Sequence, residues 1–64
     1  MMTDATILTP TELSQRYNSL VSLKTLANWR STGEGPAFTK VGSRVFYRLT
    51  DVLEWEERRT MRVG

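Results

Sequence analysis

The 64-residue sequence contains no cysteine and no histidine. Without cysteine there can be no disulfide or thiolate nucleophile, and without either residue most zinc sites are excluded. The usual general base at neutral pH is also missing. No apolar run approaches the roughly 20 residues that a membrane-spanning helix needs. We therefore expect no enzyme and no membrane protein, and no metal, cofactor or small-molecule substrate.

The length and the hydrophobic content set the size of the fold. A chain this short buries only about 60% of its unfolded surface, which does not suit a deep catalytic cleft. Its 39% hydrophobic residues are enough for one compact core. The start, "MMTDATIL", has no Lys or Arg before its few apolar residues, so we expect no secretory leader and a cytoplasmic protein. The expected organisation is one domain over residues 1–64, ordered from about 8 to 58, with a charged C-terminal tail.

The net charge of +2 is unevenly distributed. Residues 1–15 carry a net −2 and residues 49–64 a net −1. Residues 16–48 carry a net +5, with Glu34 as their one acid against six bases: Arg16, Lys24, Arg30, Lys40, Arg44 and Arg48. A basic middle between mildly acidic ends is typical of a protein that binds a polyanion.

Two short helices are predicted in the first half of the chain. In "LTPTEL", Thr9 suits an N-cap and Glu12 completes a T-x-x-E capping box, which predicts a helix over residues 10–17. A second helix is predicted over residues 22–31, with Ser22 as its cap. Gly33 is well placed to end it in a left-handed conformation, and "GEGP" at 33–36 marks a turn or loop. About four residues would join the two helices.

The second helix has an unusual polar face. At about 100° per residue, Leu23 and Trp29 fall within about 60° of Leu26, which predicts a buried side. The opposite side has no acidic residue and consists of Lys24, Asn28 and Ser31. A face that meets only water usually mixes both charge signs, whereas this one offers donors and a positive charge.

From Phe38 onward the periodicity changes from helical to two. "FTKV" and "RVFYR" flank Gly42 and Ser43, which predicts a hairpin with a two-residue turn. The expected cross-strand pairs are Val41 with Arg44, Lys40 with Val45, Thr39 with Phe46, and Phe38 with Tyr47. Phe38, Val45 and Tyr47 would then share the core side of the hairpin.

A third helix is predicted after the hairpin, with Thr50 as its cap and Asp51 in the favourable first turn. Its buried side would consist of Leu49, Val52, Leu53 and Trp55, and "EERRTMRVG" would fray at the end. The order helix, helix, β-hairpin, helix predicts a small α+β winged helix-turn-helix fold. In that arrangement the second helix enters the major groove of DNA.

The segments "LTPTELSQRY" and "VSLKTLANWRSTGEGPAFTKVGSRVFYRLTDVLEW" resemble the small winged-helix family of phage excisionases and AlpA-like regulators, relatives of the MerR DNA-binding domain. The resemblance covers residues 8–55. It implies that the second helix reads the major groove while a basic wing touches the neighbouring minor groove or the backbone. Leu23 and Ala27 stand where relatives often carry arginine or another polar residue, and Phe46 replaces a common wing arginine.

The candidate DNA-binding residues lie on the second helix and the hairpin: Ser22, Lys24, Thr25, Asn28, Arg30, Ser31, Lys40, Arg44 and Arg48. Lys24 can reach guanine acceptors, and Asn28 can pair with adenine. Arg30, at the helix margin, suits a phosphate contact. Arg44, at the hairpin tip with Lys40 and Arg48 nearby, suits the backbone or a narrow minor groove.

Each of these residues also has a simpler interpretation. Lys24 and Asn28 could be ordinary solvated surface. The charge of Arg44 could instead discourage pairing between hairpin edges. Trp29 and Tyr47 are expected to be core aromatics rather than groups that stack on bases.

The expected function is sequence-specific binding of double-stranded DNA as a phage-type excisionase, a recombination directionality factor, in a bacterial host cell. A small AlpA-like transcriptional regulator is the alternative, and a protein-interaction module or antirepressor is a further one. The expected partners are double-stranded DNA, together with an integrase or neighbouring copies of the protein on DNA.

Overall fold

The structure, a computed structural model, describes residues 6–61. The first five residues of the N-terminal segment, with Asp4, and the end of the predicted charged tail, with Arg62, lie outside the described residues. The elements follow in the order β1 (Ile7–Leu8), α1 (Pro10–Arg16), α2 (Leu23–Thr32), β2 (Thr39–Val41), β3 (Arg44–Arg48) and α3 (Leu49–Arg59). This is the expected α+β winged helix-turn-helix architecture.

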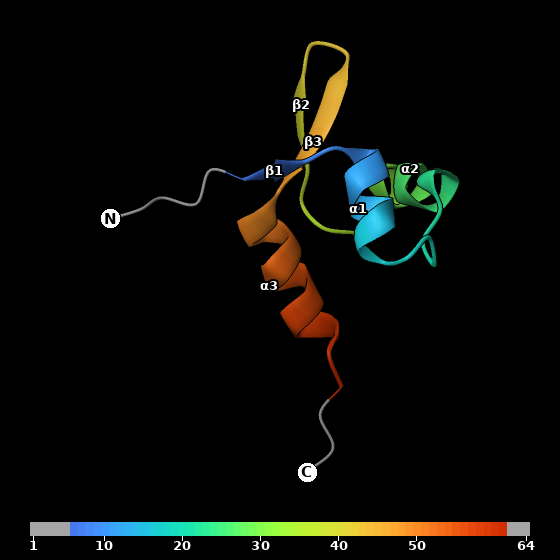
Figure 1. Cartoon of the computed structure of the whole chain (residues 1–64). Coiled ribbons are helices and arrows are strands. Elements are labelled where there is room, and N and C mark those ends of the chain that lie inside the picture. The colour runs from blue at the N-terminus through green and yellow to red at the C-terminus, as the bar shows by residue number, and fades with distance from the viewer. Residues whose placement is uncertain (1–5, 62–64) are drawn as a thin grey trace.

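The strands form an antiparallel sheet in the order β1-β3-β2. The hairpin register is the predicted one from Val41 opposite Arg44 to Thr39 opposite Phe46. The ladder stops there, and the Phe38 ring instead meets the Tyr47 ring edge-on, with centroids 6.5 Å apart. The hairpin of β2 and β3 projects away from the helices as a wing (Figure 1).

Strand β1 was not predicted from the sequence. It has only two residues, and it pairs Ile7 with Arg48 and Leu8 with Tyr47. A two-residue strand carries no readable alternation, so its signal in the sequence is too short to detect. Its effect is to place the start of the chain beside β3, at the base of the wing.

The predicted starts of α1 and α2 are confirmed by their cap geometry. At α1 the Glu12 N–H donates to Thr9 Oγ1 at 3.1 Å, and the Thr9 N–H donates to Glu12 Oε1 at 2.9 Å. At α2 the Ser22 side chain accepts from the Thr25 N–H at 3.1 Å. Gly33 ends α2 in the left-handed conformation, with φ of 79°.

The connection between α1 and α2 is longer than expected, because it occupies residues 17–22. Asn18 and Ser19 both have positive φ, which turns the chain sharply after α1. The buried Ser14 hydroxyl donates to the Val21 carbonyl at 2.8 Å, so α1 fixes the far end of the turn. The turn therefore sets where α2 begins relative to α1.

One fully buried side chain from each of α1, α2, β3 and α3 builds the core: Leu13, Leu26, Tyr47 and Val52. Trp29 and Val45 pack against this cluster, as predicted. Leu23, Phe38 and Leu53 were expected in the core but are 49%, 40% and 46% exposed. Leu23 and Leu53 lie at the margins of the buried faces of α2 and α3, and Phe38 lies just before β2.

The predicted cap of α3 was wrong. The helix begins at Leu49, one residue before Thr50, and Arg48 is its N-cap residue without a side-chain hydrogen bond. Arg48 is still paired with Ile7 of β1, and the Leu49 N–H donates to the Thr6 carbonyl at 3.0 Å. The chain therefore passes from strand to helix without a loop residue that could act as a cap.

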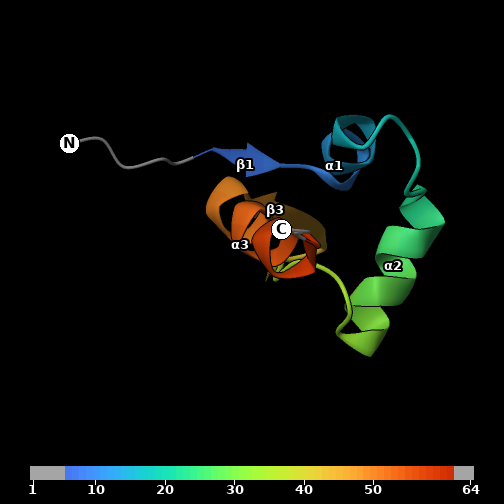
Figure 2. The ribbon, with the colours of Figure 1, turned by 90° about the horizontal axis from the view of Figure 1, so that it is seen from below.

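The third helix is also longer than predicted. The segment from Glu56 onward was expected to fray, but the chain remains helical to Arg59. Glu54 and Arg58, one turn apart, form an exposed ion pair at 3.6 Å. In Figure 1, α3 leaves the base of the wing in the direction opposite to the hairpin. Viewed from below, α2 lies to one side of β3 and α3, with α1 at the same side (Figure 2).

Candidate nucleic-acid interface

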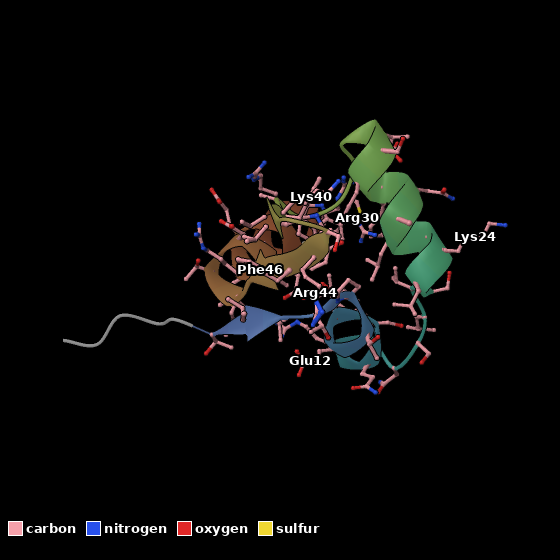
Figure 3. The ribbon with its side chains drawn as sticks, turned by 90° about the horizontal axis from the view of Figure 1, so that it is seen from above. Glu12, Lys24, Arg30, Lys40, Arg44 and Phe46 are labelled. Carbon is pink, nitrogen blue, oxygen red and sulfur yellow. The ribbon has the colours of Figure 1, made fainter. Side chains whose placement is uncertain are left out.

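The polar side of α2 is a free surface. Lys24, Asn28 and Ser31, called here the recognition face, are all exposed, while Leu26 on the other side is fully buried. Figure 3 shows Lys24 directed away from the sheet. The orientation that helical periodicity predicted for this face is therefore confirmed. Its lysine, amide and hydroxyl groups are the types that hydrogen-bond base edges in a major groove.

Two further candidates, Ser22 and Thr25, are engaged in building the helix. The Ser22 hydroxyl accepts from the Thr25 backbone and donates to Thr25 Oγ1, both at 3.1 Å. Ser22 is exposed and Thr25 is half-buried. Their observed role is to fix the first turn of α2, and a contact with DNA remains a prediction for both.

Arg30 does not lie free at the helix margin. It is half-buried, and its Nη1 donates to the Tyr47 hydroxyl at 2.7 Å. Position 30 follows Leu26 by four residues, which places it about 40° from the buried side of the helix. In Figure 3, Arg30 lies in the space between α2 and the sheet. The sequence did not reveal this bond because it joins residues 17 positions apart.

The three basic candidates of the wing do not form one patch. Alternate residues of a strand point to opposite faces, so Arg44 and Arg48 share the face opposite to Tyr47. Lys40 pairs with Val45 and therefore lies on the same face as Tyr47. All three side chains are exposed. Figure 3 shows Lys40 on the α2 side of the sheet, well apart from Arg44.

None of the basic groups on α2 or the wing has a carboxylate partner among residues 6–61. The two ion pairs found there join Arg16 to Glu56 and Arg58 to Glu54, outside this surface. The unpaired cations are Lys24, Arg30, Lys40, Arg44 and Arg48. A set of cations that the fold leaves without counter-charges, on a helix and a hairpin of one small domain, is suited to a polyanion.

A family model described as a helix-turn-helix domain matches residues 7–60, which includes every helix and strand of the structure. The chain belongs to this helix-turn-helix domain family. The match supports sequence-specific binding of double-stranded DNA. No curated protein and no solved structure matches the chain.

In this helix-turn-helix domain the loop between α2 and the wing is held by α3. The Glu34 carbonyl accepts from Trp55 Nε1 at 3.0 Å and from Arg59 Nη2 at 2.9 Å. Sequence reasoning placed Arg59 in the segment expected to fray and so missed this contact. The two hydrogen bonds fix the point at which the chain leaves the recognition helix and turns toward the wing.

A second polar contact of the helix-turn-helix domain joins α1 to α3. Arg16 donates to both carboxylate oxygens of Glu56, at 2.7 and 2.8 Å, and the Tyr17 hydroxyl donates to Glu56 Oε2 at 2.6 Å. The Arg16 hydrogen bonds hold the pKa of Glu56 below its usual range. Burial, followed by the bond to Glu56, raises the pKa of Tyr17. Arg16 is thus neutralised within the fold and differs from the unpaired cations of the interface.

No helix within residues 6–61 is long and apolar enough to cross a membrane. Across the same residues, no group of three or more acidic, cysteine or histidine side chains is placed to hold a metal ion.

Proposed function

We propose that the protein binds a specific duplex site by inserting the recognition face of α2 into the major groove. The observation that carries this proposal is the set of unpaired cations on α2 and the wing. Lys24 would contact guanine acceptors and Asn28 would pair with adenine, because these side chains match the pattern of those base edges. Ser22, Thr25 and Ser31 would add hydroxyl contacts to bases or phosphates along the same groove.

The wing would hold the DNA backbone beside that groove. Arg44 follows the Gly42–Ser43 turn at the hairpin tip and is exposed, so it can reach a phosphate or a narrow minor groove. Arg48 lies on the same face at the base of the wing. Phosphate contacts set the position of the protein and carry no sequence information of their own.

We infer further that the binding serves site-specific recombination, with the protein acting as a phage-type excisionase. The resemblance of residues 8–55 to excisionases supports this role. AlpA-like transcriptional regulators share the same module, and regulation of a promoter is the alternative. In the recombination role an integrase, or neighbouring copies of the protein on DNA, would be the protein partners.

Mapping the bound sites distinguishes these two roles. Duplexes enriched by the purified protein from a random library define its sequence, and footprinting of source DNA then locates natural sites. Protection of repeats beside an integrase attachment site, with stimulation of excision in a reconstituted reaction, supports the excisionase role. Protection confined to a promoter, without an effect on excision, supports the regulator.

A different class of function, binding to an acidic protein as an interaction module or antirepressor, would use the same cations. Titration with a duplex at two salt concentrations tests for it. Binding of DNA should weaken steeply as salt rises, because phosphate contacts release condensed counterions. Failure to bind any enriched or unrelated duplex at low salt would favour the protein partner.

A further inference from the structure

Arg30 is a half-buried cation with no carboxylate within ion-pair distance among the described residues. Removing a charge from water without a counter-charge is costly. Within the part of the chain that the structure describes, its hydrogen-bond partner is the hydroxyl of Tyr47, a neutral group, at 2.7 Å. The phenol can orient the guanidinium but cannot neutralise it. The fold therefore holds a positive charge in a fixed position, without a counter-charge among residues 6–61.

The partner hydroxyl is itself rigidly held. Tyr47 is 1% exposed, lies in the central strand β3 and belongs to the buried core cluster. Its ring cannot change position without disturbing the core, so its hydroxyl is a fixed acceptor. A guanidinium carries five N–H donors, and this bond occupies one of them. The others remain able to form the paired N–H bonds that phosphate oxygens accept.

A second unpaired cation lies on the same face of the sheet. Lys40 is opposite Val45, which makes it the diagonal neighbour of Tyr47 in the hairpin. Such diagonal Cβ atoms lie about 7–8 Å apart, within reach of a lysine side chain. Figure 3 shows Lys40 and Arg30 on the α2 side of the sheet, whereas Arg44 lies elsewhere. Arg30 from α2 and Lys40 from the wing thus both lie on the side of the sheet that Tyr47 faces.

We propose that Arg30 and Lys40 together hold one phosphate of the DNA backbone at the junction of α2 and the wing, and that Tyr47 is the positioning residue that directs Arg30 to it. The ligand is a phosphodiester of duplex DNA, so this inference rests on the proposed function. The backbone strand at this junction separates the groove that α2 enters from the groove beside the wing. The phosphate site would fix how deeply both elements enter.

The substitution Tyr47→Phe tests the positioning role, because it removes the hydroxyl and keeps the ring in the core. Binding is measured with the enriched duplex and with an unrelated duplex of equal length. We expect both affinities to fall by about three- to tenfold, the value of one net hydrogen bond. Arg30→Ala should lower both affinities further. In the Arg30→Ala background, Tyr47→Phe should have no additional effect on binding.

Tyr17→Phe is the matched control, since its hydroxyl donates to Glu56 of α3, whereas the Tyr47 hydroxyl accepts from Arg30. It should leave both affinities unchanged at temperatures where the variant is folded. A merely structural role for Tyr47 would lower the melting temperature without this dependence on Arg30. The proposal is overturned if Tyr47→Phe binds like the wild type, or if it weakens binding equally with and without Arg30.

A second test does not depend on how Tyr47→Phe folds. Single neutral methylphosphonates are placed in turn along the backbone of the enriched duplex. We expect one position at which the methylphosphonate weakens binding by the wild type. At that position it should have no effect on binding by Arg30→Ala and a smaller effect on binding by Lys40→Ala. Finding no such shared position would overturn the phosphate site. Failure of the wild type to bind any duplex would instead refute the proposed function itself.

Discussion

The indole rings of Trp29 and Trp55 lie 5.4 Å apart, tilted by 47°. They join the end of the recognition helix α2 to α3, and the Arg59 guanidinium lies 5.2 Å from the centre of the Trp55 ring. Gly35 comes so close to this pair that a Cβ there would lie 2.9 Å from the Trp29 ring. Together with the bonds to the Glu34 carbonyl, this cluster fixes α2 and the wing relative to each other.

Trp29→Ala should lower the free energy of unfolding by about 3 kcal/mol, the low end for a core aromatic, because Trp29 is only half-buried. That is a large part of the stability of so small a domain. Denaturant unfolding followed by circular dichroism measures it. Leu20→Ala is the control, since Leu20 is 87% exposed and should contribute little. An unchanged midpoint for Trp29→Ala would mean that the ring contributes nothing to the fold and would revive a role in stacking on bases.

Glu56→Gln should lower the stability at pH 7, because it removes the charge that pairs with Arg16. The loss should be only about 1 kcal/mol, since both members of the pair are partly screened by solvent. The pKa of Glu56 is depressed in the folded state. The contribution of the carboxylate is therefore present above the unfolded pKa of about 4.3 and is lost as the pH falls through the lower folded value.

Unfolding curves of the wild type and Glu56→Gln at several pH values test this. The difference between them should be constant from about pH 5 to 8 and should shrink below about pH 4. Glu54→Gln is the control, because its ion pair with Arg58 is exposed and long at 3.6 Å. A difference that grows on acidification would show that the Glu56 carboxylate destabilises the fold.

Arg44→Ala should weaken binding to the enriched and the unrelated duplex by similar factors. Its position at the wing tip suits a phosphate, so the salt slope of log K should fall by about 0.9, the share of one phosphate. Arg58→Ala removes the same charge from α3, where the fold pairs it with Glu54, and should leave the slope unchanged. Loss confined to the enriched duplex, with an unchanged slope, would mean that Arg44 reads sequence.

Local chemistry made much of this fold predictable. Thr9 and Glu12 identify a helix start through their own hydrogen bonds, and Gly33 ends α2 because few other residues adopt its conformation readily. The Gly42–Ser43 turn determined the hairpin register. Strand β1 was missed because it depends on β3, which is distant in the sequence.

In the candidate site, the exposed side of α2 was predictable from the sequence, whereas the contact between α2 and the sheet was not. Periodicity alone placed Lys24 and Asn28 on the exposed side of α2. The partner of Arg30 could not be predicted, because the bond to Tyr47 exists only after α2 packs on the sheet. The separation of Lys40 from Arg44 follows from the predicted register, in which Lys40 pairs with Val45 of the core side.

The central claim is that the recognition face of α2 reads base edges, and Lys24→Ala and Asn28→Ala test it most directly. The measurement is the affinity of each variant for the enriched duplex and for an unrelated duplex at one salt concentration, with the fold checked by circular dichroism. We predict that each variant loses about 1–3 kcal/mol of binding to the enriched duplex while remaining folded. Asn28→Ala should bind the unrelated duplex like the wild type. If both variants bind the enriched duplex as tightly as the wild type, α2 is not the element that reads the sequence.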